Sequence, residues 1–415
     1  MKTIFICILC GFVTIQLTGQ EIKSYNLNVN IDTKTKKLHV EGLIDIDYGS
    51  RDTISLVLWR NSNIQSINFS RTPLRFIFDT ISPSPSIYIP DGRKLNVIRP
   101  GGSKEHQSVF FKYESDLSDL NGWSRVFSED WIELNYYSAW FPLNIDSRNF
   151  TSKFNIFIDN DYKITGSGIV TRKNDHWEMV QPWSGFDNVL IASKSLKSKV
   201  IHKNNLYFET DYVDFPDADA DSINNECKYV SDYYQNLFGT KDSTYLKFVV
   251  APFETGGGYS RKNFICLRTK QFGLYTCMGI GHELAHFWWS NATTTSWEDW
   301  LNEAFAQYSM DIYLRERLGS SVFEKEIDDY KERAKNTPPI WGIDRNDSRA
   351  YSVLYEKGAL ILNELEQKMG KQQFIRLLKI AATAKVKTTN EFLDIMEMNF
   401  SKEIRQWMEQ KLKTA

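Results

Sequence analysis

Residues 281–305 constrain the fold more than any other part of the chain. Their sequence is GHELAHFWWSNATTTSWEDWLNEAF. The segment contains two of the six histidines in the chain, His282 and His286, four residues apart. Side chains at this spacing lie on one face of an α-helix. The spacing therefore predicts a helix whose two imidazoles can reach the same ion.

The residue after the first histidine adds the chemistry of a metal-dependent hydrolase. Glu283 completes an HExxH arrangement, in which the histidines bind zinc and the glutamate acts as general base. Such a site needs a third protein ligand and an open position for water. A second helix starts in WEDWLNEAF after a short loop, so the adjacent helix ends can converge. We predict that Glu303 completes a His₂Glu site for one Zn²⁺ per chain. The alternative is a core helix with two incidental histidines.

The first half of the chain has the periodicity of β-strands. Apolar and polar residues alternate in YNLNVNI, LHVEGLIDIDY and TISLVLW, and turn sequences such as PDGRK and RPGGS separate these runs. Residues 20–200 are therefore predicted to form an all-β domain, either a sandwich or an open, saddle-like twisted sheet.

The pattern changes near residue 200 and becomes helical after Met278. Two strand-like runs, NLYFETDYV and YLKFVVAPF, flank a helical one. Later segments carry apolar residues at three- and four-residue intervals, namely 320–336, 355–369, 372–382, 389–398 and 403–412. Residues 201–415 are predicted to form an α/β catalytic domain, so the fold class is α+β with several domains.

Composition and the N-terminal residues indicate an exported protein. Residues 1–19 have a lysine, an apolar run and a small residue before the expected cleavage site, as a signal peptide does. The alternative is a buried N-terminal strand. We expect a secreted or periplasmic location. A net charge of -2 does not indicate nucleic acid as a partner. No later apolar run is long enough to span a membrane.

The two halves of the central segment resemble a known family. HELAHFWWSN followed by WLNEAFAQY is similar to the membrane alanyl aminopeptidase family, whose pattern is HExxHxW, a spacer and WLNEGFA. Its members are zinc peptidases with a thermolysin-like catalytic domain behind a β-rich domain. The resemblance implies that His282, His286 and Glu303 bind zinc and that Glu283 is the general base. The spacer of residues 287–302 is shorter than is usual in the family, but it falls in a loop, where deletions are tolerated.

Two further stretches resemble the same family. The YEKG sequence that begins at Tyr355 is similar to a motif whose tyrosine donates a hydrogen bond to the oxyanion of the tetrahedral intermediate. The alternative is a tyrosine that packs the start of a helix. In the β domain, Glu133 lies eight positions before Phe141, as does a family residue that helps to bind the amino group of the substrate. The alternative for Glu133 is a surface glutamate.

One family motif is altered. Relatives carry GxMEN on a strand that lines the cleft, and its glutamate binds the free α-amine. Alignment places Gly257, Gly258, Tyr259 and Ser260 on this strand, with Ser260 in place of the glutamate. Arg261 follows, where it would repel an ammonium group. We predict that the four aligned residues bind substrate, and that recognition of the N-terminal amine is altered. Exopeptidase and endopeptidase action both remain open.

Together these features predict a zinc-dependent peptidase that acts on peptide or protein substrates. The alternative is a binding or scaffolding protein that resembles a peptidase and retains zinc for stability. Glu283 and Tyr355 favour catalysis, because a module that needs only the metal has no use for a base or an oxyanion donor.

Overall fold

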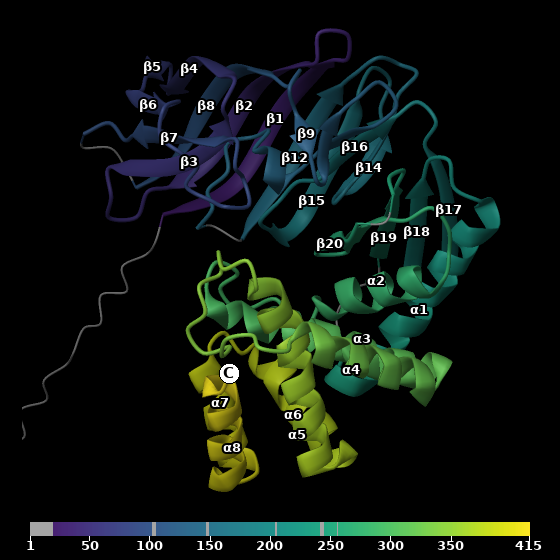
Figure 1. Ribbon diagram of the computed structural model, residues 1–415. Coiled ribbons are helices and arrows are strands. Elements are labelled where there is room, and N and C mark those ends of the chain that lie inside the picture. The colour runs from purple at the N-terminus through teal and green to yellow at the C-terminus, as the bar shows by residue number, and fades with distance from the viewer. Residues whose placement is uncertain (1–19, 102–104, 147–148, 204–205, 241–244, 255) are drawn as a thin grey trace, which may run out of the picture. The chain divides into compact units, whose positions relative to one another are not determined.

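The computed structural model describes residues 20–101, 105–146, 149–203, 206–240, 245–254 and 256–415 (Figure 1). The predicted signal peptide, residues 1–19, lies outside the described residues. The chain divides into two compact units, Met1–Lys194 and Ser195–Ala415. The boundary that the sequence predicts, at residue 200, falls inside a strand of the second unit, β17 (Lys197–Lys203).

The first unit is built around an eight-stranded sheet. In spatial order its strands are β14 (Ile169–Arg172), β15 (Trp177–Gly185), β12 (Phe150–Phe157), β1 (Glu21–Asp32), β2 (Lys37–Asp47), β8 (His106–Asp116), β4 (Ser62–Phe69) and β5 (Thr72–Pro73). Strand β1 pairs antiparallel with β2 and parallel with β12. Alternate residues of β1, namely Tyr25, Leu27 and Val29, are buried, as the period-two pattern predicts.

Two smaller sheets complete this unit. One contains, in order, β13 (Lys163–Gly166), β16 (Leu190–Ser193), β11 (Ile132–Leu134), β10 (Arg125–Phe127) and β9 (Asn121–Gly122). The other contains β3 (Thr53–Trp59), β7 (Gly92–Ile98) and β6 (Phe76–Asp79). A short 3₁₀ turn, η1 (Tyr136–Ser138), follows β11.

Aromatic side chains fill the core of the first unit. Tyr25 packs edge-on against Phe141, with ring centroids 5.2 Å apart, and its phenol donates to the carbonyl of Pro142 at 2.7 Å. The indole of Trp140 donates to the carbonyl of Asn188 at 3.0 Å. Buried aromatic residues with satisfied polar atoms give both packing area and fixed orientation.

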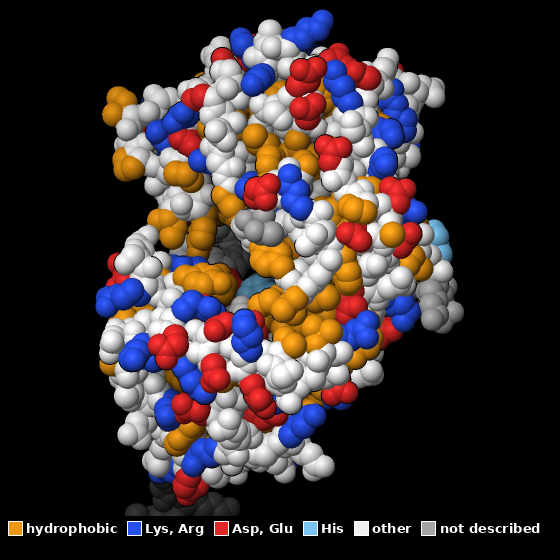
Figure 2. All heavy atoms as spheres, turned by 45° about the vertical axis from the view of Figure 1, so that its right-hand side comes forward, with side chains coloured by type: hydrophobic (Ala, Val, Ile, Leu, Met, Phe, Trp, Pro, Cys, Tyr) orange, Lys and Arg blue, Asp and Glu red, His pale blue; other side chains and the backbone are white. Residues whose placement is uncertain are grey.

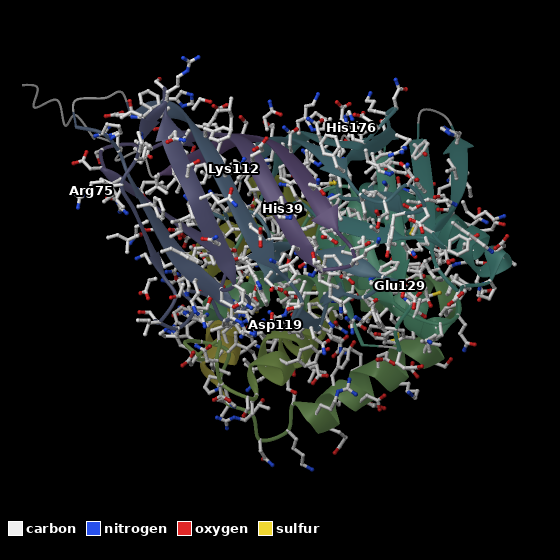
Figure 3. All side chains as sticks on the ribbon, turned by 90° about the horizontal axis from the view of Figure 1, so that it is seen from above. His39, Arg75, Lys112, Asp119, Glu129 and His176 are labelled. Atoms are coloured by element: carbon white, nitrogen blue, oxygen red, sulfur yellow. The ribbon has the colours of Figure 1, made fainter. Side chains whose placement is uncertain are left out.

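The opposite face of the large sheet carries charged pairs. His39 on β2 and Lys112 on β8 lie on this face (Figure 3). The ammonium of Lys112 lies 3.1 Å from the carboxylate of Glu41 across the two strands. Figure 2 shows basic and acidic side chains interspersed over the face in view, in agreement with a net charge of -2. These pairs are exposed and contribute little to stability.

The second unit begins with a five-stranded mixed sheet. Its order is β17, β18 (Leu206–Tyr212), β19 (Tyr245–Ala251), β21 (Phe264–Arg268) and β20 (Gly258–Arg261). Strand β20 is an edge strand that pairs antiparallel with β21. Helices α1 (Asp217–Phe238) and α2 (Leu274–Ala285) share a hydrophobic core with the sheet residues Phe208, Phe248 and Ile265.

Helices form the rest of this unit. They are η2 (Trp297–Asp299, a 3₁₀ turn), α3 (Trp300–Leu318), α4 (Ser320–Arg333), η3 (Ser352–Lys357, a π-helical turn), α5 (Gly358–Met369), α6 (Lys371–Ala384), α7 (Thr389–Asn399) and α8 (Lys402–Lys413). Four of the five predicted C-terminal helical segments match these bounds closely, whereas the one predicted from residue 355 starts as a π-helical turn at Ser352.

Two further observations concern the cysteines and the hydropathy of the helices. Cys227, Cys266 and Cys277 are all free and buried. In the part of the chain that the structure describes, no helix combines the length and the hydropathy that crossing a bilayer requires.

Candidate metal centre and active site

Helices α2 and α3 bring the predicted metal ligands together. His282 lies in the last turn of α2, His286 follows at its C-cap, and Glu303 lies in the first turn of α3. The helices approach closely at Gly281, where a Cβ atom would lie only 2.8 Å from the ring of Tyr313 on α3. Glycine at this position therefore allows the two ligand-bearing segments to pack in contact.

The ligand atoms have the spacing of a tetrahedral site. The Nε2 atoms of His282 and His286 lie 3.2 Å apart, and each lies 3.4 Å from Oε2 of Glu303. Zinc binds nitrogen and oxygen at about 2.0–2.1 Å, so two ligand atoms of a tetrahedral ion are about 3.3–3.4 Å apart. The three atoms fit one zinc ion without rearrangement.

The polar atoms at the centre also fit a metal. Oε2 of Glu303 is buried and has no hydrogen-bond partner, although two imidazole nitrogens surround it. A buried carboxylate oxygen without a partner is costly. A cation bound to Glu303 and both histidines would remove that cost, and this set of nitrogen and oxygen donors is one that zinc prefers.

The charges of the ligands perturb one another. Burial by itself raises the pKa of Glu303, but the imidazoles of His286 and His282 outweigh burial and hold this pKa below its ordinary value. Burial lowers the pKa of His286, but Glu303 and Glu283 reverse the effect and raise it to about 10. The centre thus attracts positive charge strongly, as a metal site must.

Surrounding hydrogen bonds orient the ligands. Nδ1 of His286 lies 3.0 Å from the carbonyl oxygen of Trp289, to which it can donate. The amide of Asn302, which neighbours Glu303, accepts from the backbone N–H of Ala292 at 3.1 Å and donates to the carbonyl of the same residue at 3.2 Å. Asn302 therefore ties the loop after the histidines to the start of α3. Such outer contacts commonly set ligand geometry.

Glu283 lies beside the edge strand of the sheet. A Cβ atom on Gly258, at the start of β20, would lie 3.3 Å from Oε1 of Glu283 and 2.8 Å from the carbonyl oxygen of Cys266. Only glycine allows this approach. The preceding residue, Gly257, has a φ of 87° and donates its N–H to the phenol oxygen of Tyr275 at 2.7 Å. These contacts place the glycine segment beside Glu283, and its role in substrate binding stays a prediction.

The other residues of β20 divide between two faces. Successive side chains of a strand point to opposite faces, so Ser260 shares the face of Gly258, whereas Tyr259 and Arg261 occupy the other. The guanidinium of Arg261 stacks 4.8 Å from the ring centroid of Tyr259, and both side chains are buried. Alternation along the strand thus places Arg261 on the face opposite to Gly258 and Ser260, and its repulsion of a substrate ammonium stays a prediction.

Tyr355 lies against the metal ligands. Its ring is parallel to that of His282, with centroids 5.9 Å apart. Burial raises the pKa of its phenol well above the ordinary value, and the carboxylate of Glu303 adds to this shift. The π-helical turn that carries Tyr355 ends at Gly358, where a Cβ atom would lie 2.4 Å from Cβ of Ala304. The glycine of the YEKG sequence thus lets this turn pack beside Glu303.

Glu133 belongs to the first unit. It lies on β11, is fully buried, and accepts a hydrogen bond from the indole of Trp131 at 3.1 Å. The alternative of a surface glutamate is wrong. The role of Glu133 in substrate binding stays a prediction.

Three residues near the centre were not found by the sequence analysis. Tyr351 is 57% exposed and stacks on Tyr355, with ring centroids 4.4 Å apart. Asp299, which is buried, forms an ion pair with the partly buried Arg345, with 3.0 Å between Oδ2 and Nε. Tyr351 and Asp299 lie four residues before Tyr355 and Glu303, so helical spacing could have indicated them. Arg345 lies in a loop outside any motif, and no sequence signal marks it.

Comparison with known proteins agrees with this geometry. Residues 274–411, which include all three candidate ligands, match the peptidase family M1 domain. The match begins with α2 and ends within α8. Human endoplasmic reticulum aminopeptidase 2 is 31% identical over 117 residues, which is 24% of this chain and 12% of the relative. Aminopeptidase N of Lactococcus lactis is 23% identical over 321 residues, 68% of this chain and 36% of the relative. The chain therefore spans only part of the length of these relatives.

Solved structures share the whole fold. An M1 zinc metallopeptidase mutant from Deinococcus radiodurans, bound to a Tyr-Ser-Ala substrate, superposes with a TM-score of 0.72 at 16% identity, covering 96% of this chain and 95% of that one. A leukotriene A4 hydrolase from Saccharomyces cerevisiae gives a TM-score of 0.76 at 17% identity, covering 95% of this chain and 68% of that one. The predicted fold class, a β domain followed by a catalytic domain, is confirmed.

Proposed function

We propose that this protein is a zinc-dependent peptidase of the aminopeptidase type, which hydrolyses peptide bonds. One observation carries the proposal. His282, His286 and Glu303 offer three ligand atoms that fit a tetrahedral ion, Tyr355 lies beside His282, and Glu283 is close enough to His286 to raise its pKa. Zinc bound there would polarise a carbonyl group and lower the pKa of a water molecule.

The side chains of the protein supply the remaining chemistry. The Glu283 carboxylate accepts a proton from the attacking water and passes it to the amine that leaves. The Tyr355 phenol donates a hydrogen bond to the oxyanion that develops on the carbonyl oxygen. Because burial raises its pKa, this phenol stays protonated and able to donate at neutral and moderately alkaline pH.

The edge strand β20 is the proposed site of substrate alignment. Its second edge has no partner strand among the described residues. An extended peptide can pair with such an edge through its backbone. Gly258 then holds the peptide beside Glu283, and Ser260 meets the substrate on the same face. Since Ser260 offers a hydroxyl where relatives have a carboxylate, we infer weaker recognition of the N-terminal amine. Glu133 is the proposed second contact with that amine.

The proposal predicts activity that depends on the metal. The purified protein is incubated with a mixture of peptides, with and without a chelator, and cleavage products are identified by mass spectrometry. Cleavage should stop with the chelator and return when zinc is added. A protein that binds one zinc per chain but cleaves no peptide would favour the alternative of a binding or scaffolding role.

We also propose that the protein is exported, because residues 1–19 have the pattern of a signal peptide. Expression in a host with an export pathway, followed by mass determination of the mature N-terminus, tests this. A mature protein that begins at Gln20 supports export, whereas a protein that keeps residues 1–19 and stays inside the cell contradicts it.

A further inference from the structure

Two parts of the candidate active site come from separate stretches of the second unit. Glu303 begins α3, whereas Tyr355 lies on the π-helical turn η3. Between α4 and η3 the chain runs through residues 334–351, which contain no regular helix or strand longer than a turn. An irregular loop does not by itself fix the position of Tyr355 relative to Glu303.

A partly buried ion pair joins these two stretches. Asp299 directly precedes α3, and Arg345 lies in the loop before η3. Their Oδ2 and Nε atoms are 3.0 Å apart, and their side chains are only 1% and 15% exposed. Asp299 occupies the N-cap position of α3, yet its side chain caps no backbone N–H of that helix. Its carboxylate is instead used to bind side chains.

The second oxygen of Asp299 extends the connection. Oδ1 accepts a hydrogen bond from the amide of Asn302 at 2.9 Å. The side-chain amide of Asn302 in turn forms two hydrogen bonds with the backbone of Ala292, in the loop that follows His286. A single carboxylate thus connects three segments, which carry the histidines, Glu303 and Tyr355.

Arg345 also makes the burial of Asp299 tolerable. Burial raises the pKa of Asp299 to about 7, and the carboxylate of Glu303 adds to the shift, while Arg345 opposes it. Two nearby buried carboxylates repel each other, and a cation paired with one of them offsets this repulsion. The same guanidinium is close enough to Tyr355 to lower the pKa of its phenol, opposite to the effect of Asp299. Arg345 therefore balances charge at the edge of the metal centre.

We propose that Arg345 and Asp299 are positioning residues, whose ion pair holds Glu303 and Tyr355 in register around the metal. This inference rests on the function proposed above. Neither residue touches the reacting atoms, so both act through the groups that they hold.

The test uses substitutions in the full-length protein. Arg345→Met removes the charge but keeps a long apolar side chain, Arg345→Lys keeps the charge, and Asp299→Asn removes the other partner. Arg315→Met is the matched control. Arg315 forms a comparable pair with Glu366, at 2.8 Å, which also joins α3 to α5 but lies away from the ligands. Each variant is assayed for kcat, KM, melting temperature and zinc affinity, the last by competition with a chelator.

Loss of contacts around metal ligands commonly costs about 10- to 100-fold in activity or metal affinity. Arg345→Met and Asp299→Asn should lower kcat by this factor at saturating zinc, with KM changed less, and should weaken zinc affinity about tenfold or more. Arg345→Lys should recover most of the loss. Arg315→Met should lower the melting temperature but leave kcat and zinc affinity within about twofold.

The inference is overturned if Arg345→Met lowers only the melting temperature, or if Arg315→Met costs as much activity and zinc affinity as Arg345→Met. If Arg345→Met does not fold, the kinetics and zinc affinity of Arg345→Lys and Asp299→Asn test the inference. Failure of the proposed function gives a different result, namely wild-type protein that binds zinc without cleaving peptides. The zinc affinity of the variants, measured by competition with a chelator, then still tests the positioning role, because this measurement needs no turnover.

Discussion

The backbone of Gly258 lies directly beside the carboxylate of Glu283, so close that a Cβ atom on the glycine would be 3.3 Å from Oε1. The proposed general base therefore borders the edge strand along which we place the substrate. The same Cβ would lie 2.8 Å from the carbonyl oxygen of Cys266 on the neighbouring strand. Even the smallest side chain must displace either the strand or the base.

Gly258→Ala should consequently reduce activity without removing the metal. A displacement of about 1 Å near reacting groups can cost about 100-fold in rate. We expect kcat to fall by about 10- to 100-fold while zinc content stays at one per chain. Gly273→Ala is the control, because a Cβ atom there meets no atom within 4 Å. Steady-state kinetics with metal analysis check both variants, and equal activity of the two would refute the close approach.

Glu303→Ala should remove most of the bound zinc. The substitution deletes one of three ligands and leaves two imidazoles, which hold zinc far more weakly. Metal content after dialysis is the measurement. Glu298→Ala, five residues earlier, serves as a control, since Glu298 bonds to Thr389 rather than to a ligand. Full zinc in Glu303→Ala would show that the short loop between the helices has been aligned wrongly.

Glu283→Gln should abolish the general base without removing a metal ligand. Glutamine has the size of glutamate but accepts no proton, so zinc and folding should persist. General acid–base catalysis contributes about 10²- to 10⁴-fold, and kcat should fall by at least that factor. Metal analysis and turnover of one peptide substrate suffice. Retained turnover would require another base.

Tyr355→Phe should lower kcat more than it raises KM, since the hydroxyl acts on charge that forms in the transition state. Loss of one oxyanion donor costs about 10²- to 10³-fold. Because the pKa of Tyr355 is raised, its proton is retained as pH rises through the ordinary tyrosine pKa. In the wild type, kcat should therefore show no decline from this group below about pH 10. Tyr351→Phe is the matched control, and a pH–rate profile of both checks the assignment.

The wild-type protein, with Ser260, should bind the substrate amine more weakly than a protein with a carboxylate at position 260. Ser260 is neutral, and a buried ammonium without a paired charge is costly. Matched peptides with free and acetylated N-termini should differ little in kcat/KM. Ser260→Glu should increase the preference for the free amine, whereas Glu133→Ala should reduce any preference that remains. A strict demand for a free amine that survives Glu133→Ala would contradict this and indicate another anchor.

Local patterns were sufficient to predict much of this protein. The four-residue spacing of His282 and His286 specifies a helix face, and period-two alternation specifies strands, because both depend only on backbone geometry. The short loop between the two predicted helices pointed to Glu303, and the family resemblance pointed to Tyr355. The structure brings these residues together as predicted, and the architecture of a β domain before a catalytic domain is confirmed by solved structures.

The tertiary structure decided the contacts between residues that are distant in sequence. Asp299 and Arg345 are 46 residues apart, and nothing in either local sequence indicates that they pair. The sequence did not specify which face of β20 meets Glu283. Only the place of the strand in the sheet decides this, with Gly258 on the face of Glu283 and Arg261 stacked on Tyr259 on the other. Spacing along the chain thus indicated the groups for which we propose catalytic and ligand roles. The packing of α2, α3 and η3 determined how they are held, since close approaches at Gly281 and Gly358 exist only once the helices are assembled.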